Sequence, residues 1–146
     1  MFESILVGTD GSDAAGAAVL RAVQLAAALG ARLQIVSAYE PVPERHLRIE
    51  RVHVPSDVQV NMREEVLALL QSSRQEAEAA GVARVQTFAR VGDAADAILD
   101  VAEEQGSDLI VVGNKGMTGA TRFLVGSVPN KVSHHAPCSV LIVRTR

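Results

Sequence analysis

The chain has 146 residues, of which 48% are hydrophobic and only 3% aromatic, and its formal net charge is −3. This length predicts one domain spanning 1–146, whose aliphatic core suits helices packed on a parallel sheet. The acidic balance argues against nucleic acid or an anionic membrane as the main partner, and no apolar run reaches the roughly 18 residues of a membrane span. The chain does not open with a basic segment followed by an apolar one. We therefore expect no signal peptide and a cytoplasmic location.

Strand and helix patterns alternate along the whole chain. Apolar runs predict strands at 4–8, 32–39, 84–91, 108–112 and 139–143. Helical spacing with capping residues and terminal glycines predicts helices at 14–29, 57–80, 92–104 and 126–135, and a proline-containing loop at 41–55. This alternation indicates an open, doubly covered parallel sheet with right-handed crossovers. A ligand on such a sheet binds beyond the carboxyl ends of the strands.

A glycine-punctuated segment follows the fourth predicted strand. It reads Gly113-Asn114-Lys115-Gly116, and after a nine-residue spacer Gly126-Ser127 leads into the last helix. Glycines let a backbone approach an anion, and the free N–H groups and dipole of a helix start favour negative charge. Ser127 is predicted to cap this helix, and Pro129 falls in its first turn, where a missing N–H costs nothing. The pattern differs from both the Walker A and the dinucleotide fingerprints, yet it indicates a phosphate site.

The spaced pattern, G-x2-G-x9-G-S, resembles the nucleotide-binding motif of the ATP-binding branch of the universal stress protein family. The resemblance covers nearly the whole chain, including the opening 5–12 and the closing 139–143. It implies a Rossmann-like fold with strand order 3-2-1-4-5. It also implies that Thr9 and Asp10 line the adenine and ribose side of a pocket. Ala38 and Val112 would pack against the base.

Several candidate residues also have a plain structural interpretation. Asp10 could be only a turn residue at the start of the first helix. Lys115 could contact phosphate or simply be solvated, and the same two interpretations hold for Arg122. The complete predicted site comprises Thr9, Asp10, Ala38, Val112, Gly113, Lys115, Gly116, Gly126, Ser127, Val128 and Pro129.

The histidine and cysteine side chains do not form a catalytic pattern. His134 and His135 point about 100° apart on a helix and fall at its predicted C-terminus, where a cation complements the dipole. Cys138 cannot form an internal disulfide, and we expect it to pack as a small hydrophobe. The chain has neither a G-x-S-x-G elbow nor an H-E-x-x-H motif. We therefore expect neither catalytic nor metal-ligating residues.

The leading functional hypothesis is an adenine-nucleotide-binding sensor or regulator of a stress response. ATP is the first choice of ligand, with Mg²⁺ or Mn²⁺ carried by its phosphates, and cyclic AMP is the second choice. Two further hypotheses are a slow ATPase or nucleotidyl transferase, and a structural or chaperone-like dimer. The last strand, 139–143, is strongly apolar and predicted at a sheet edge. The family resemblance implies that it pairs with its counterpart in a homodimer.

Overall fold

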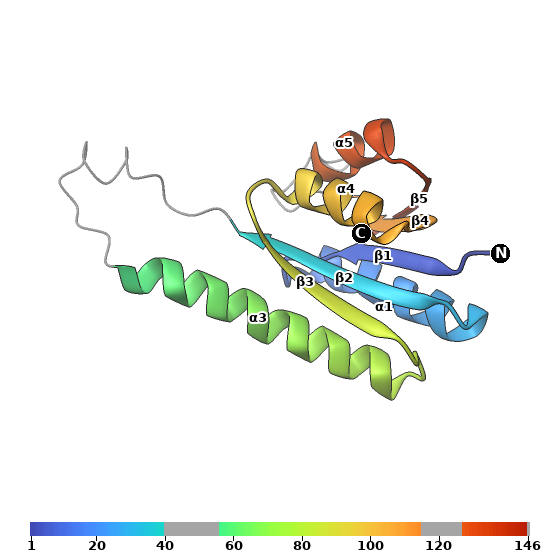
Figure 1. Cartoon of the computed structure of the whole chain (residues 1–146), viewed down its shortest axis with the longest axis horizontal. Coiled ribbons are helices and arrows are strands. Elements are labelled where there is room, and N and C mark those ends of the chain that lie inside the picture. Colours follow the sequence, from blue (N-terminus) through green and yellow to red (C-terminus); the bar gives the residue numbers. More distant parts are fainter. Residues whose placement is uncertain (40–55, 115–126, 146) are drawn as a thin grey trace.

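The protein is a single open sheet of parallel strands covered by helices on both faces (Figure 1). The computed structural model describes residues 1–39, 56–114 and 127–145, except for the side chains of 56–61. Its elements are β1 (Ser4–Gly8), α1 (Asp13–Leu29), β2 (Arg32–Tyr39), α3 (Ser56–Ala79), β3 (Val85–Val91), α4 (Ala94–Gln105), β4 (Leu109–Gly113), α5 (Ser127–His135) and β5 (Ser139–Val143). The predicted elements are thus confirmed with boundary shifts of one or two residues, whereas the predicted loop at 41–55 lies outside the described residues.

The five strands pair in the order β3-β2-β1-β4-β5, and every neighbouring pair is parallel. This order confirms the prediction and places β1 beside β4. It leaves β3 and β5 as the two edge strands. Within the described residues, no helix has the length and apolar character needed to cross a membrane.

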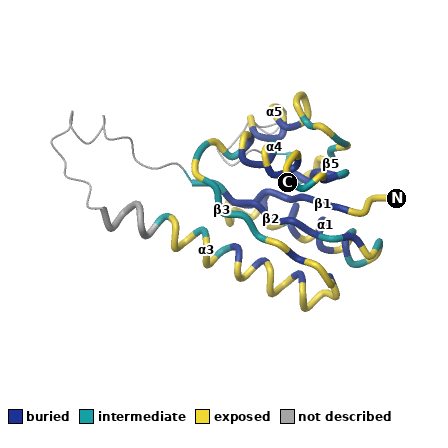
Figure 2. The backbone as a smooth tube through the Cα atoms, in the orientation of Figure 1, coloured by how far each residue is buried: buried dark blue, intermediate teal, exposed yellow. Residues whose placement is uncertain are grey.

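Alternate residues of the central strands build two separate cores. On one face Ile5, Leu33 and Val111 pack with α1 and α3, and on the other Leu6 and Val36 pack with α4 and α5. Because successive side chains of a strand point to opposite faces, one apolar run in β1 supplies both cores. Figure 2 shows buried residues along the centre of the sheet and many of the exposed residues on the helices.

Local capping signals set the helix ends. At the start of α1, the Ser12 hydroxyl accepts a hydrogen bond from the Ala15 N–H at 3.2 Å. At the start of α4, the Asp93 carboxylate accepts one from the Asp96 N–H. Gly30 ends α1 in the left-handed conformation, with φ of 67°. A residue with a side chain adopts that conformation only at a cost, which explains why glycine marks the end of the helix in the sequence.

Candidate functional site

The carboxyl ends of β1, β2 and β4 meet at one edge of the sheet. Thr9 and Asp10 follow β1, Ala38 lies near the end of β2, and Gly113 ends β4. Asp10, Gly11, Ser37 and Ala38 line a hollow of about 270 Å³ at this edge, and the opposite wall consists of Glu65, Val66 and Leu69 of α3. The hollow is slightly smaller than the usual range for whole drug-sized ligands, so its size suits part of a nucleotide.

The turn after β1 is held by its own side chains. Thr9 is buried; its N–H donates to the Val36 carbonyl at 3.0 Å, and its hydroxyl accepts from the Gly11 N–H at 3.2 Å. The exposed Asp10 accepts a hydrogen bond from the Ser12 N–H through Oδ1 at 2.9 Å. The turn role considered for Asp10 is therefore confirmed. It is compatible with ligand binding, because an exposed carboxylate can accept more than one hydrogen bond.

Sequence reasoning missed three residues of α3 that form a wall of the hollow. Leu69 lies three positions after Val66 and four after Glu65, so it neighbours both of them on the helix surface. The helical pattern could have identified this shared face. The helical pattern does not indicate that this face lies over the ends of β1 and β2, because that placement depends on how the chain crosses from β2 through α3 to β3.

Ala38 and Val112 differ in their surroundings. Ala38 is half-buried, touches the core formed with α4 and α5, and also lines the hollow. Val112 is 3% exposed, lies within that core and is not among the residues that line the hollow. The structure thus brings Ala38, but not Val112, to the hollow beside Asp10.

The start of the glycine motif is tied to the chain after β5. The Asn114 N–H donates to the Val143 carbonyl at 2.9 Å, and its side-chain oxygen accepts from the backbone N–H and the hydroxyl of Thr145, at 2.7 and 2.9 Å. These bonds fix Asn114, the first residue after β4, against the end of β5 and Thr145. Lys115, Gly116 and Gly126 lie outside the described residues, as does Arg122.

The helix that ends the motif is anchored at its first turn. Val128 and Pro129 are buried, and Pro129 occupies the third helical position as expected. Ser127 is exposed and is the first residue of α5. Its predicted capping role stays a prediction, because the residue before it lies outside the described residues. The hydroxyl still lies at the helix start, where free N–H groups favour an anion.

An ion-pair cluster connects the starts of α4 and α5. Lys131 Nζ lies 2.7 Å from Asp96 Oδ1 and 3.4 Å from Asp93 Oδ2. The hydrogen bond to Asp96 is the main reason that the pKa of Lys131 is raised, and the hydrogen bond to Asp93 acts in the same direction. The cluster is exposed, so its contribution to the free energy of unfolding is small.

The histidines of α5 and the cysteine before β5 lie where the sequence predicted. His134 and His135 lie in the last turn of α5, as predicted, and the His134 Nδ1 contacts the Asn130 carbonyl at 2.8 Å. Cys138 is partly buried against the second core, as expected, and burial together with the Asp108 charge raises the pKa of its thiol. Among the described residues, no three His, Cys, Asp or Glu side chains gather as a metal site.

An open parallel sheet with a hollow at the carboxyl ends defines the class of α/β proteins that bind ligands at a strand-order reversal. Residues 1–144 match the model of the universal stress protein family, and the chain belongs to that family. Universal stress protein Rv1636 of Mycobacterium tuberculosis is 38% identical over 144 residues, covering 99% of this chain and 97% of that protein.

Two solved structures show the same architecture over almost their full lengths. A universal stress protein crystallised in complex with cAMP is 35% identical, with a TM-score of 0.76, and the match covers 99% of this chain and 98% of that one. The hypothetical protein MJ0577 is 25% identical with a TM-score of 0.84, and the match covers 100% and 98% of the two chains.

Proposed function

We propose that this universal stress protein binds an adenine nucleotide at the carboxyl ends of β1, β2 and β4, as a cytoplasmic sensor or regulator of a stress response. The observation that carries the proposal is the hollow formed by Asp10, Gly11, Ala38 and α3 beside the start of the glycine motif. Family membership and the cAMP complex of a 35% identical relative support it.

The hollow fits the nucleoside part of the ligand better than its phosphates. Among the described residues, its lining contains two carboxylates, Asp10 and Glu65, and no cation. Carboxylates accept hydrogen bonds from ribose hydroxyls or an amino group but repel phosphate. Ala38 offers a small apolar surface to the base, since a larger side chain would fill the hollow.

The phosphates are assigned to the glycine motif and the first turn of α5. Gly113 ends β4, and Ser127, Val128 and Pro129 form the helix start that follows the motif. Helix N-termini bind phosphate through backbone N–H groups. The contribution of Lys115, Gly116 and Gly126 rests on the sequence pattern. In this proposal, Mg²⁺ or Mn²⁺ is carried by the phosphates of ATP.

ATP and cAMP are the two candidate ligands. The spaced glycine pattern favours a polyphosphate, whereas the structure of a relative bound to cAMP favours the cyclic nucleotide. Mass spectrometry of the denatured, freshly purified protein would reveal a retained nucleotide, and calorimetric titration with ATP, cAMP and adenosine would rank the affinities. Saturable binding of ATP or cAMP supports the proposal. Absence of binding by all three ligands to the folded protein would refute it.

The same proposal includes a homodimer formed through β5. This edge strand exposes Leu141 and Ile142, with 38% and 37% of their surfaces accessible. An open apolar edge invites pairing with another strand. We expect a dimer in sedimentation equilibrium and a monomer after Leu141→Asp and Ile142→Asp, with circular dichroism as the folding control. A monomeric unmodified protein at micromolar concentration would exclude this interface.

A further inference from the structure

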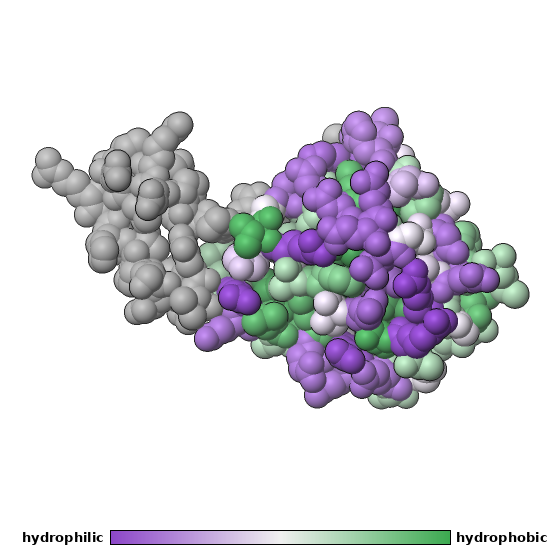
Figure 3. All heavy atoms as spheres, viewed as in Figure 1, coloured by the Kyte–Doolittle hydropathy of each residue, from purple (hydrophilic) through white to green (hydrophobic). Residues whose placement is uncertain are grey.

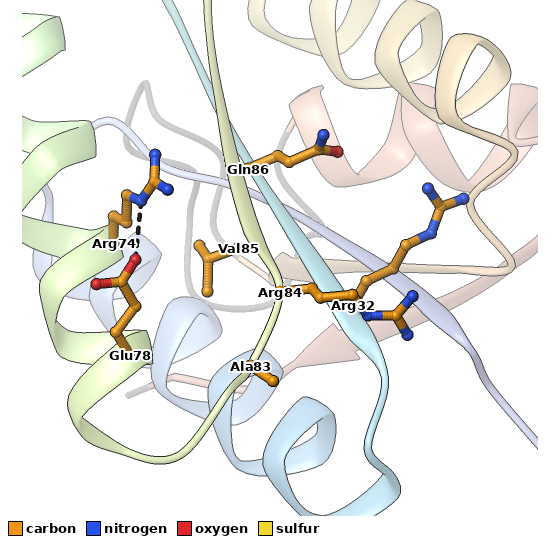
Figure 4. Close-up of a pocket in the computed structure, with 7 residues that line it drawn as sticks. All are labelled: Arg32, Arg74, Glu78, Ala83, Arg84, Val85 and Gln86. Atoms are coloured by element: carbon orange, nitrogen blue, oxygen red, sulfur yellow. Dashed lines mark hydrogen bonds and ion pairs between the residues drawn. The ribbon is translucent and has the colours of Figure 1, made fainter.

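A second hollow lies at the opposite end of the sheet, where β2 and β3 begin (Figure 4). Its volume is about 370 Å³, and its lining includes Arg32, Arg74, Arg84, Glu78 and Gln86. Three arginines and one glutamate give it a positive balance in a chain whose net charge is −3. The lining of this amino-end hollow is therefore positively charged, whereas the chain as a whole is negatively charged.

Two of the arginines are neighbours across the sheet. Leu33 pairs with Val85 in the register of β2 and β3, and the Leu33 N–H donates to the Arg84 carbonyl at 2.9 Å. Arg84 thus lies beside Arg32, and Figure 4 shows both guanidinium groups on the same side of β3, opposite to Val85. Like charges in adjacent positions of a sheet destabilise it unless a counter-charge lies between them.

The chain's own carboxylates do not neutralise this pair within the described residues. Arg32 donates to the backbone carbonyl of Gln105 at 2.5 Å, which is a neutral acceptor. Glu78 forms its ion pair with Arg74 at 2.9 Å, on the α3 side of the hollow. The charge of Arg74 is thereby largely offset, and the uncompensated charge lies at Arg32 and Arg84.

A buried amide near the pair, Gln34, has one donor without a partner but does not itself line the hollow. Gln34 is fully buried, and its Oε1 accepts from the hydroxyls of Ser4 and Ser107 at 3.1 and 3.0 Å. Its Nε2 lacks a hydrogen-bond partner in the described structure. Gln34 follows Arg32 by two positions on β2, and its partner in register, Gln86, follows Arg84 by two positions. These four side chains therefore share one face of the sheet. Buried donors without partners are uncommon.

We propose that Arg32 and Arg84, assisted by Gln86, form a second binding site, for a small molecule that carries a phosphate or carboxylate group. The planar guanidinium fork matches two oxygens of either group, and an anion between the two arginines removes their repulsion. A hollow of about 370 Å³ is near the lower limit for ligand pockets and suits a small metabolite. The site is separate from the nucleotide edge, so it does not depend on the proposed function.

The test is a titration of the full chain with an anionic probe at low ionic strength, in which NMR amide chemical shifts report binding. Pyrophosphate and malonate serve as probes for the phosphate and carboxylate groups. We expect saturable shifts at the amino ends of β2 and β3 with at least one probe, and the tighter probe identifies the group. Shifts confined to the start of α5 would instead place the probe at the nucleotide edge and overturn the proposal, as would absence of saturation with both.

Matched variants separate a built site from general attraction to positive charge. Arg84→Gln is expected to weaken the tighter probe about tenfold or more, and Arg84→Lys to weaken it less, because lysine keeps the charge but not the fork. Arg21→Gln is the control, since Arg21 is an exposed arginine of α1 that contacts Gln24. Equal loss in Arg21→Gln and Arg84→Gln, or no loss in a folded Arg84→Gln, would refute the site.

Discussion

The two hollows at opposite ends of the sheet have linings of opposite charge among the described residues. At the carboxyl end, the hollow beside β1 and β2 contains the carboxylates of Asp10 and Glu65, and at the amino end, the hollow beside β2 and β3 is lined by three arginines. Both hollows use α3 as a wall: its earlier turns face the first and its later turns the second. Figure 3 shows polar and apolar side chains interspersed over the viewed face between these ends.

This contrast shows why charge alone would misplace the nucleotide. A phosphate is attracted to the arginines at the amino end, yet the glycine motif and the start of α5 follow β4 at the carboxyl end. Backbone N–H groups at a helix start bind phosphate without a cationic side chain. In the proposed arrangement, the carboxylates at the same edge would repel phosphate, so the hollow would take the nucleoside.

The largest expected effects concern the carboxyl end. Gly126→Ala or Ser127→Ala should weaken ATP binding about tenfold or more, since one hydrogen bond to a charged group is worth about 1.5–3 kcal/mol. Asp10→Ala should weaken ATP and adenosine alike, because its contact is assigned to the nucleoside. Isothermal titration calorimetry measures all three variants.

Two controls sharpen this first prediction. Asp13→Ala changes a carboxylate in the first turn of α1 that does not line the hollow, and Arg84→Gln changes the opposite end of the sheet. Both are expected to retain ATP affinity. Unchanged affinity in all three folded site variants would mean that the glycine motif only shapes a loop.

Backbone conformation provides a second test that compares the two ends. Gly11 at the carboxyl end and Gly30 at the amino end have φ of +83° and +67°. A Cβ added at Gly11 would lie 3.5 Å from the Leu69 side chain, which is an ordinary contact. A Cβ added at Gly30 would have no described atom within 4 Å. Alanine at either position should therefore lower the free energy of unfolding by about 1–2 kcal/mol, measured by urea denaturation. Only Gly11→Ala should also change the affinity for nucleotide. Equal nucleotide affinities in the two variants would mean that Gly11 is not part of the binding site.

A smaller effect is expected at Glu65. Its side chain is exposed, so replacing the carboxylate by an amide in Glu65→Gln should change adenosine affinity by about threefold. Glu64→Gln, one position away and outside the lining of the hollow, is the matched control. Competition with a fluorescent adenosine analogue would detect the difference. Identical affinities for the two variants would remove α3 from the nucleoside site.

The smallest effect concerns Cys138, which lies before β5 at the amino end. Burial and the Asp108 charge raise the pKa of its thiol above the ordinary value of 9.0. The folded thiol therefore keeps its proton to higher pH than the unfolded thiol. As the pH rises from the pKa of the unfolded thiol through that of the folded thiol, the contribution of this group to the free energy of unfolding falls. We expect slower alkylation by iodoacetamide in the folded protein than in urea, with Asp108→Asn increasing the rate modestly. Equal rates in folded and unfolded protein would contradict this.

Local signals in the sequence determined the elements and most of the topology. Apolar runs identified the strands, the caps at Ser12 and Asp93 and the glycines at 30 and 106 identified helix ends, and the alternation of elements required a parallel sheet. The strand order came from the family resemblance. The residues after β1 and β4 were predicted to lie at one edge because parallel strands end on the same side.

Tertiary structure alone decided which residues from distant segments share a surface. It brought Glu65 and Leu69 to the same hollow as Asp10, placed Val112 in the core and not in the lining of that hollow, and set Arg84 beside Arg32. Each of these depends on how a crossover helix lies on the sheet or on the register between two strands. Periodicity along the chain reports which residues share a face of one element, but the partner of that face is selected by packing between elements, which local sequence does not encode.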